Sequence, residues 1–254
     1  MSFCGIDGAV TIAESAVTDN NRYIGGQSIA LYANETIEYI DKTVIDDVVS
    51  PKAVPVYYTD TLPNACGAVA GAIAVGYYDY YYENMIPGWK SALSSGRFKT
   101  MDSVYVPKLL QQLYNDMRTN VVAPGVSENE FLTGFSDYVN SNGYSAEYRS
   151  IWNGRFDVQA FKSSLKNNEV SVLFLPSCKY NTIDDCDGVD IITENTIAGN
   201  HIMVAYGYRE VNYRLRNGMR TDTYIMVATG LSDVKVAYVK ADTFMGSAYV
   251  IRLG

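Results

Sequence analysis

The sequence predicts an α+β protein in which helices come first along the chain and strands come last. Residues 66–169 hold several stretches with helical periodicity, whereas residues 170–254 hold mostly short apolar runs and strand-like alternation. Hydrophobic residues make up 48% of the 254, enough to bury a substantial core. Because helices and strands are segregated along the chain, we expect the C-terminal half to form an antiparallel sheet.

The sequence predicts that residues 1–50 form an N-terminal flank and that the main domain spans residues 51–254. The flank holds the strand-like stretches "AVTIAESAV" and "QSIALYAN", followed by the acidic stretch "ETIEYIDKTVIDDVVS". Two roles are open, extra strands or a pro-segment. An integral flank is favoured, since no processing linker precedes Pro51. Residues 54–59, "VPVYYT", then predict a strand.

The next element is a helix that begins at Cys66. Its residues, "CGAVAGAIAVGYY", are apolar nearly all round, which predicts that the helix is buried. A cysteine at a helix N-terminus lies at the positive end of the helix dipole, which stabilises a thiolate and lowers the thiol pKa. Cys66 is therefore the cysteine with the strongest indication of reactivity.

Three further helices are expected, over residues 103–120, 127–145 and 156–169. The second has Ser127 as its cap, Glu130 three positions later and a stop at Gly143. The expected strands that follow cover residues 170–176, 201–211, 220–230, 234–240 and 247–254.

Composition excludes several classes of partner. The net charge of −8 and the absence of a basic run argue against nucleic acid and anionic membranes. No apolar stretch reaches the roughly 18 residues that span a bilayer. The first residues do not resemble a signal peptide, yet 22 tyrosines against 20 Lys plus Arg favour a secreted or cell-surface bacterial protein over a cytoplasmic one. Nothing indicates an oligomeric state.

The other three cysteines do not predict a metal site. Cys178 and Cys186 bracket the acidic loop "KYNTIDD" and either form a disulfide or remain two thiols, while Cys4 lies near the terminus. No C-x-x-C pair exists, which argues against zinc. The acids of "TIDDCDGVD" lack the spacing of a calcium loop. We expect no metal and no cofactor.

The chain contains one histidine, His201, in "AGNHIMVAYGY" at the start of an expected strand. Histidine is the usual general base for a cysteine nucleophile, because its pKa lies near neutrality. A lone histidine is more often structural than catalytic. Here its separation from Cys66 suits a cysteine peptidase with a helix-borne nucleophile. Cys66 and His201 therefore form a candidate thiolate–imidazolium pair.

Both motifs resemble those of bacterial papain-fold cysteine peptidases, the streptopain-like and bacteriocin-leader-processing (double-glycine) peptidase-like groups. "NACGAVAGAIAVGYY" is similar to the C-G-x-x-A-x-A pattern around their nucleophile, and "GNHIMVAYGY" to their histidine strand. The resemblance covers roughly residues 54–250. It implies a papain-like fold, with the Cys66 helix packed on the C-terminal antiparallel sheet, and hydrolysis of peptide or protein substrates.

Two positions depart from the pattern that the resemblance implies. The glutamine whose amide helps to hold the oxyanion is replaced by Asp60, and Asn64 is the alternative amide donor beside the backbone N–H of Cys66. The Asn or Asp that accepts a hydrogen bond from the imidazole is replaced by Thr229, with Asp233 as the fallback.

Three functions are therefore weighed. The first is a cysteine peptidase that works through Cys66, His201 and an acyl-enzyme. The second is a catalytically impaired relative that binds peptides or a protein partner, as the substitutions at Asp60 and Thr229 allow. The third is another thiol reaction on the same fold, such as acyl transfer or amide hydrolysis of a small molecule.

Overall fold

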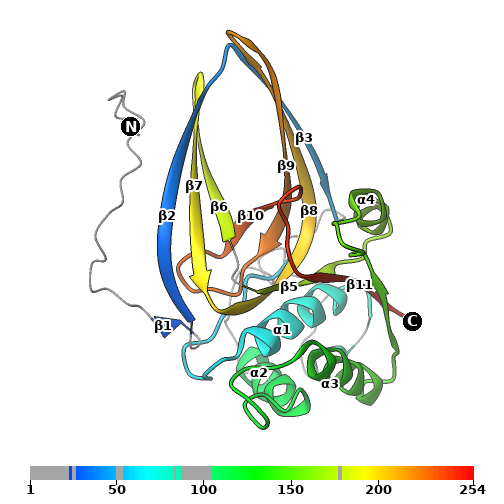
Figure 1. The fold of residues 1–254 in the computed structure, drawn as a ribbon. Helices are drawn as coiled ribbons and strands as arrows, with labels where there is room; N and C mark the ends of the chain where they lie inside the picture. The colour runs from blue at the N-terminus through cyan, green and yellow to red at the C-terminus, as the bar shows by residue number, and fades with distance from the viewer. Residues whose placement is uncertain (1–22, 25–26, 50–53, 83, 87–104, 177–178) are drawn as a thin grey trace.

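The computed structural model describes residues 23–24, 27–49, 54–82, 84–86, 105–176 and 179–254 (Figure 1). The predicted α+β class is confirmed: these residues form four helices and a large antiparallel sheet. The helices are α1 (Cys66–Tyr78), α2 (Tyr105–Asp116), α3 (Glu128–Ser141) and α4 (Val158–Lys166). The strands are β1 (Tyr23–Ile24), β2 (Gln27–Glu38), β3 (Asp41–Val48), β4 (Ala146–Ser150), β5 (Ser171–Pro176), β6 (Lys179–Cys186), β7 (Val189–Ala198), β8 (Asn200–Leu215), β9 (Gly218–Ala228), β10 (Val236–Lys240) and β11 (Ser247–Leu253).

The sheet runs in the order β1-β2-β7-β6-β10-β9-β8-β5-β11-β4, and β3 also pairs with β8. β8 is long enough to have two neighbours on one edge. Residues 200–205 pair with β5, and residues 207–214 pair with β3. The sheet therefore divides along β8 into a part that lies on the helices and a part that extends beyond them (Figure 1).

The extended part is here called the strand lobe and comprises residues 27–48, 179–196 and 207–226. Its strands form two wings that rise to a shared tip, with β2, β6 and β7 on one side and β3, β8 and β9 on the other (Figure 1). The chain crosses between the wings at Tyr39 and Ile40, whose N–H groups donate to the carbonyls of Gly188 at 3.0 Å and Arg214 at 2.8 Å. Residues 27–48 are thus strands of the same sheet as the C-terminal half.

The four helices with β4, β5 and β11 are here called the helical base. α1 is its centre: every residue from Gly67 to Tyr78 is buried, as the apolar sequence predicts. α2 and α3 lie below α1 and contact each other closely (Figure 1). A methyl group on Gly134 of α3 would lie 2.6 Å from the backbone nitrogen of Met117, so only glycine allows this approach.

The predicted cap of α3 is confirmed. The Ser127 side chain accepts from the backbone N–H of Glu130, whose carboxylate accepts from the backbone N–H of Ser127 at 2.9 Å. This reciprocal pair is a capping box. At the other end, Gly143 follows the helix with a positive φ of 87°, the left-handed conformation that ends helices.

Two local predictions are wrong. Residues 54–59 do not form a strand: Pro55 has no N–H to donate to a ladder, and both Pro55 and Tyr57 pack against Gly76 of α1 instead. Residues 179–185, predicted as an acidic loop, belong to strand β6, which pairs with β7 and β10. There Asp184 and Asp185 are both exposed, whereas Ile183 before them is partly buried.

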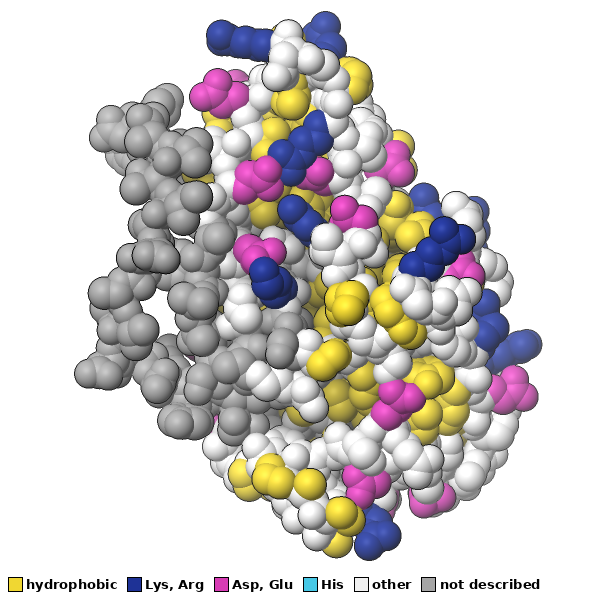
Figure 2. Space-filling view, viewed as in Figure 1, with side chains coloured by type: hydrophobic (Ala, Val, Ile, Leu, Met, Phe, Trp, Pro, Cys, Tyr) yellow, Lys and Arg dark blue, Asp and Glu magenta, His cyan; other side chains and the backbone are white. Residues whose placement is uncertain are grey.

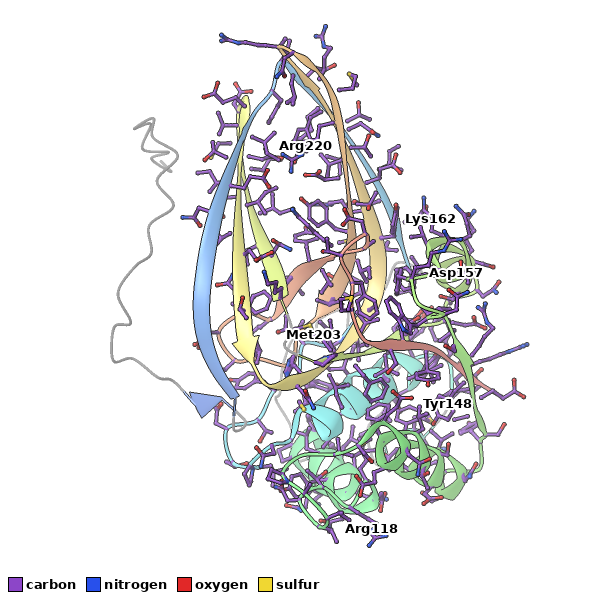
Figure 3. The ribbon with its side chains drawn as sticks, in the orientation of Figure 1. Arg118, Tyr148, Asp157, Lys162, Met203 and Arg220 are labelled. Atoms are coloured by element: carbon purple, nitrogen blue, oxygen red, sulfur yellow. The ribbon has the colours of Figure 1, made fainter. Side chains whose placement is uncertain are left out.

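Two hydrophobic cores correspond to the two parts. The larger lies in the helical base and under the first half of β8, where Figure 3 places Met203 above α1. The smaller lies between the wings of the strand lobe, and its buried members are Ile37, Ile192, Val211, Tyr213 and Tyr224. Figure 2 shows basic and acidic side chains lying together over the strand lobe. Within the described ranges, no helix has the length and apolar character needed to cross a bilayer.

Candidate functional site

Cys66 is the first residue of α1 and the only residue of that helix that is not buried. The preceding residue, Ala65, supplies no side-chain cap, so the first backbone N–H groups of the helix have no side-chain acceptor there. No acidic residue lies in the first turn to offset the positive end of the helix dipole. The sulfur is thus placed where a thiolate would be stabilised.

The described cysteines are in different oxidation states. Cys66 is not disulfide-bonded, whereas Cys186, at the end of β6, is. Cys178, the partner considered for Cys186 from the sequence, lies outside the described residues, as does Cys4. A nucleophile needs a reduced thiol, and Cys66 meets this requirement.

His201 is the second residue of β8, and it is only 3% exposed. Its Nε2 lies 2.7 Å from the backbone carbonyl oxygen of Thr229. A carbonyl can only accept, so Nε2 carries a proton and donates it. Burial lowers the pKa of the imidazole to about 4, although the bond to Thr229 opposes the shift. The ring is therefore neutral at pH 7.

A neutral imidazole has a single N–H, so the Nδ1 of His201 carries a lone pair. Nδ1 is buried and has no hydrogen-bond partner among the described residues. A buried polar atom without a partner is costly. Nδ1 is accordingly the one ring nitrogen able to take up a proton, and the structure records no hydrogen bond from it to Cys66.

The structure brings Thr229 to His201, but through a different atom from the one expected. The hydroxyl of Thr229 donates to the carbonyl of Val234 and accepts from the N–H of Leu231 at 3.1 Å. The backbone carbonyl of Thr229 makes the contact with the imidazole. Asp233 is exposed, accepts from the hydroxyl of Ser232 at 3.3 Å, and makes no hydrogen bond to His201.

The two expected oxyanion side chains lie in the segment before α1. Asp60 is exposed. Asn64 has a positive φ of 54°, and its amide nitrogen donates to the side-chain oxygen of Asn120 at 2.9 Å. The amide expected to face an oxyanion is thus bound elsewhere.

Asn120 is a residue that sequence reasoning missed. It has a positive φ of 64°, its amide nitrogen donates to the carbonyl of Pro63 at 3.1 Å, and its amide oxygen also accepts from the N–H of Gly125 at 2.7 Å. Asn120 therefore ties the loop between α2 and α3 to the segment that leads into Cys66. The sequence placed Asn120 at the end of the helix expected over residues 103–120, with no hint of its distant partner, whereas α2 ends at Asp116.

Three chain segments converge around these residues. A methyl group on Gly67, next to Cys66, would lie 3.6 Å from Cδ1 of Ile202, next to His201. A methyl group on Gly230, next to Thr229, would lie 2.9 Å from Cγ1 of Val69 in the first turn of α1. The start of α1, the start of β8 and the end of β9 thus pack together where the strand lobe joins the helical base.

A hollow on the described part of the chain lies away from these residues. It has a volume of about 470 Å³, and a second hollow of about 320 Å³ adjoins it through Asn167, Glu169 and Arg252. Tyrosines from the C-terminal end of α1 line the larger one, which places it at the opposite end of the helix from Cys66. None of the predicted site residues lines either hollow.

Comparisons with known proteins add no identity. No family model, no curated protein and no solved structure matches this chain. In the part of the chain that the structure describes, no group of three or more His, Cys, Asp or Glu residues is arranged to hold a metal ion. The chemistry available at the site is therefore argued from the thiol, the imidazole and the backbone.

Proposed function

We propose that this protein is a cysteine peptidase with a papain-like fold, in which Cys66 is the nucleophile and His201 the general base. The observation that carries the proposal is the state of His201. Its Nε2–H is bonded to a backbone carbonyl, and its buried Nδ1 has no hydrogen-bond partner within the described part of the chain. A structural histidine would normally satisfy both nitrogens, whereas a general base needs one nitrogen available.

The reaction follows from these roles. The Cys66 sulfur attacks the carbonyl carbon of a peptide bond while its proton passes to Nδ1 of His201. The imidazolium then donates that proton to the leaving amine, and an acyl-enzyme remains. Water, deprotonated by the same nitrogen, hydrolyses the thioester and regenerates the thiol. Because burial keeps the resting imidazole neutral, proton transfer accompanies attack rather than preceding it.

Backbone N–H groups at the start of α1 would stabilise the oxyanion. The N–H of Cys66 is the first of them, and the helix dipole adds a partial positive charge. A side-chain donor is not provided by Asn64, whose amide nitrogen binds Asn120. We therefore expect turnover to be slower than in a peptidase with a side-chain donor, which contributes about 10²–10³-fold.

The lack of a side-chain donor for the oxyanion favours a second candidate, a catalytically impaired protein that binds peptides. Asp60 is exposed and carries no amide, and the amide of Asn64 is held by its hydrogen bond to Asn120. On this alternative Cys66 stays reactive and the protein binds peptides, but it does not hydrolyse them. Peptide binding without hydrolysis separates it from the first candidate.

The test combines a peptide library with thiol labelling. Wild-type protein should cleave a subset of peptides, and Cys66→Ala should abolish cleavage. His201→Gln is the matched variant, because the glutamine amide keeps a donor for the Thr229 carbonyl but cannot act as a base. It should lower kcat by at least about 10²-fold. Activity unchanged in both variants would exclude the proposal.

Labelling reports on the site without turnover. With limiting iodoacetamide at pH 6, Cys66 should be alkylated before any other cysteine, because the positive end of the α1 dipole favours its thiolate. Small-molecule amides and acyl-transfer acceptors assayed in parallel identify the third function considered, another thiol reaction. Faster labelling of a different cysteine would mean that Cys66 is not the nucleophile.

The disulfide at Cys186 supports a secreted or cell-surface location, which we also propose. Disulfides persist in oxidising compartments and are rare in the cytoplasm. Mass spectrometry of protein alkylated without reductant, after purification from its native host, would test this. Recovery of alkylated Cys186 would contradict it.

A further inference from the structure

The turn between β9 and β10, residues 229–235, is built around Thr229. The N–H of Thr229 donates to the carbonyl of Lys235 at 3.1 Å, and its hydroxyl bridges the N–H of Leu231 and the carbonyl of Val234. Thr229 itself is fully buried. All three of these bonds close the turn, and the one polar atom left over, the carbonyl oxygen, accepts from His201.

The turn is also held from outside. Gly230 has a positive φ of 73°, and a methyl group there would lie 2.9 Å from Cγ1 of Val69. The turn therefore rests directly on the first turn of α1. On its other side, Ala228 pairs with Val236 of β10 and with Val204 of β8. The Thr229 carbonyl is fixed relative to both the helix and the strand that carries His201.

A backbone carbonyl differs from the side chains that usually orient an imidazole. It never donates a hydrogen bond and carries no titratable proton. Whenever the imidazole is neutral, the carbonyl therefore requires the Nε2–H tautomer and leaves the lone pair on Nδ1. A carboxylate would in addition stabilise the imidazolium.

We propose that Thr229 is the positioning residue for His201, that it acts through its main-chain carbonyl, and that its hydroxyl serves only to close the turn. The proposal rests on the proposed function where rate is concerned. Asp233 takes no part, since Nε2 of His201 is bonded to the Thr229 carbonyl and Nδ1 has no hydrogen-bond partner among the described residues. Introducing Asn at position 229, the residue type that the family resemblance implies, would lower the rate, because this side chain is directed to Val234 and not to the imidazole.

The single histidine makes the tautomer measurable. In protein labelled with ¹⁵N-histidine, all imidazole signals come from His201. At pH 7, wild type should show a protonated Nε2 and an unprotonated Nδ1, and Thr229→Ser, which retains the hydroxyl, should show the same. Thr229→Val, which keeps the shape but loses the hydroxyl, should show both tautomers in exchange.

Rates give the second readout. Thr229→Ser and Asp233→Ala should stay within about twofold of wild type, whereas Thr229→Val and Thr229→Asn should lose about tenfold in kcat with KM unchanged, as expected of a group that only orients the base. Thr229→Ser keeps the hydroxyl but is smaller, whereas Thr229→Val keeps the shape. A normal rate in the serine variant alone would therefore show that the hydroxyl matters at residue 229 and that side-chain volume does not.

Several results would overturn the proposal. An Nδ1-protonated imidazole in wild type, or a changed tautomer in Asp233→Ala, would do so whether or not Thr229→Val folds. A Thr229→Val protein with the wild-type tautomer and rate would also do so. Absence of turnover in wild type would instead remove the proposed function, while the tautomer spectra would still test the positioning role.

Discussion

The strands of the helical base and of the strand lobe belong to one sheet, but the two parts are stabilised by different interactions. In the base, α1 is buried along its length and its neighbours are apolar. In the lobe, the apolar core is small, and ion pairs join the wings around it: Lys42 lies 2.8 Å from Asp190, and Arg220, which Figure 3 places between the wings, lies 2.6 Å from Glu35. Burial should therefore decide the stability of the base, and charge should matter more in the lobe.

The candidate site lies where these two parts meet. Cys66 comes from the base, whereas His201 lies on β8 and Thr229 directly follows β9, and both strands continue into the lobe. A rigid apolar helix places the thiol, and a hydrogen-bonded turn places the imidazole. The two halves of the site should therefore respond to different perturbations.

The largest difference should come from truncating one isoleucine in each core. Ile73→Ala in α1 should lower the free energy of unfolding by about 4 kcal/mol, because the surrounding helices cannot collapse into the cavity. Ile192→Ala in the lobe should cost about 2 kcal/mol, since partly buried neighbours can relax. Urea denaturation of both variants measures the difference. Equal costs would mean that the lobe core is as rigid as the base.

The next effect concerns glycines in the base. Gly134→Ala should cost about 3 kcal/mol, because the added methyl group meets the backbone of Met117, which cannot move aside. Gly71→Ala is the matched control. Its methyl group would come closest to Cε of Met117, at 2.7 Å, which is the end of a flexible side chain, and would lie at least 3.4 Å from Leu113 and Phe135. Alanine also favours the helix. Thermal unfolding should separate the two; a similar loss in both would mean that the contact at Gly134 is not decisive.

Lowering the pH should decrease the free energy of unfolding through His201, which lies where the base and the lobe meet. The pKa of the folded imidazole, about 4, lies below the unfolded value of 6.5, so as pH falls the unfolded chain binds a proton first. This group therefore destabilises the fold between pH 6.5 and 4, by up to about 3 kcal/mol. Wild type should lose that much more stability than His201→Gln over this range. Parallel pH profiles would contradict the burial of a neutral imidazole.

The smallest effects should come from ion pairs. Lys42→Met leaves the buried carboxylate of Asp190 with Tyr213 as its donor, at 2.7 Å, and should cost about 2 kcal/mol. Lys179→Met, which removes an exposed pair of the same 2.8 Å length with Glu194, should change stability by at most about 0.5 kcal/mol. Hydrogen exchange should show the Lys42 effect in the strand lobe alone. A uniform increase in exchange would mean that lobe and base unfold together.

Local patterns in the sequence were sufficient to predict the helices. Ser127, Glu130 and Gly143 define the ends of α3 through contacts within a few residues, and the apolar run after Cys66 indicates a buried helix whatever surrounds it. The strands after residue 200 were likewise predicted from alternation. These signals are reliable because the interactions that produce them are short-range. Cys66 and His201 were named for their chemistry, and whether they react together stays a prediction.

The tertiary structure alone decided which segments pair and which atoms meet. Residues 54–59 have strand-forming side chains, but they pack on α1 because Pro55 cannot complete a ladder. Residues 179–185 look like an acidic loop and become a strand because β7 and β10 lie beside them. The contact of His201 is the clearest case. Its acceptor is a backbone carbonyl, a group that every residue carries, so no side chain at Thr229 could reveal it and only the position of the turn in space brings it to the imidazole.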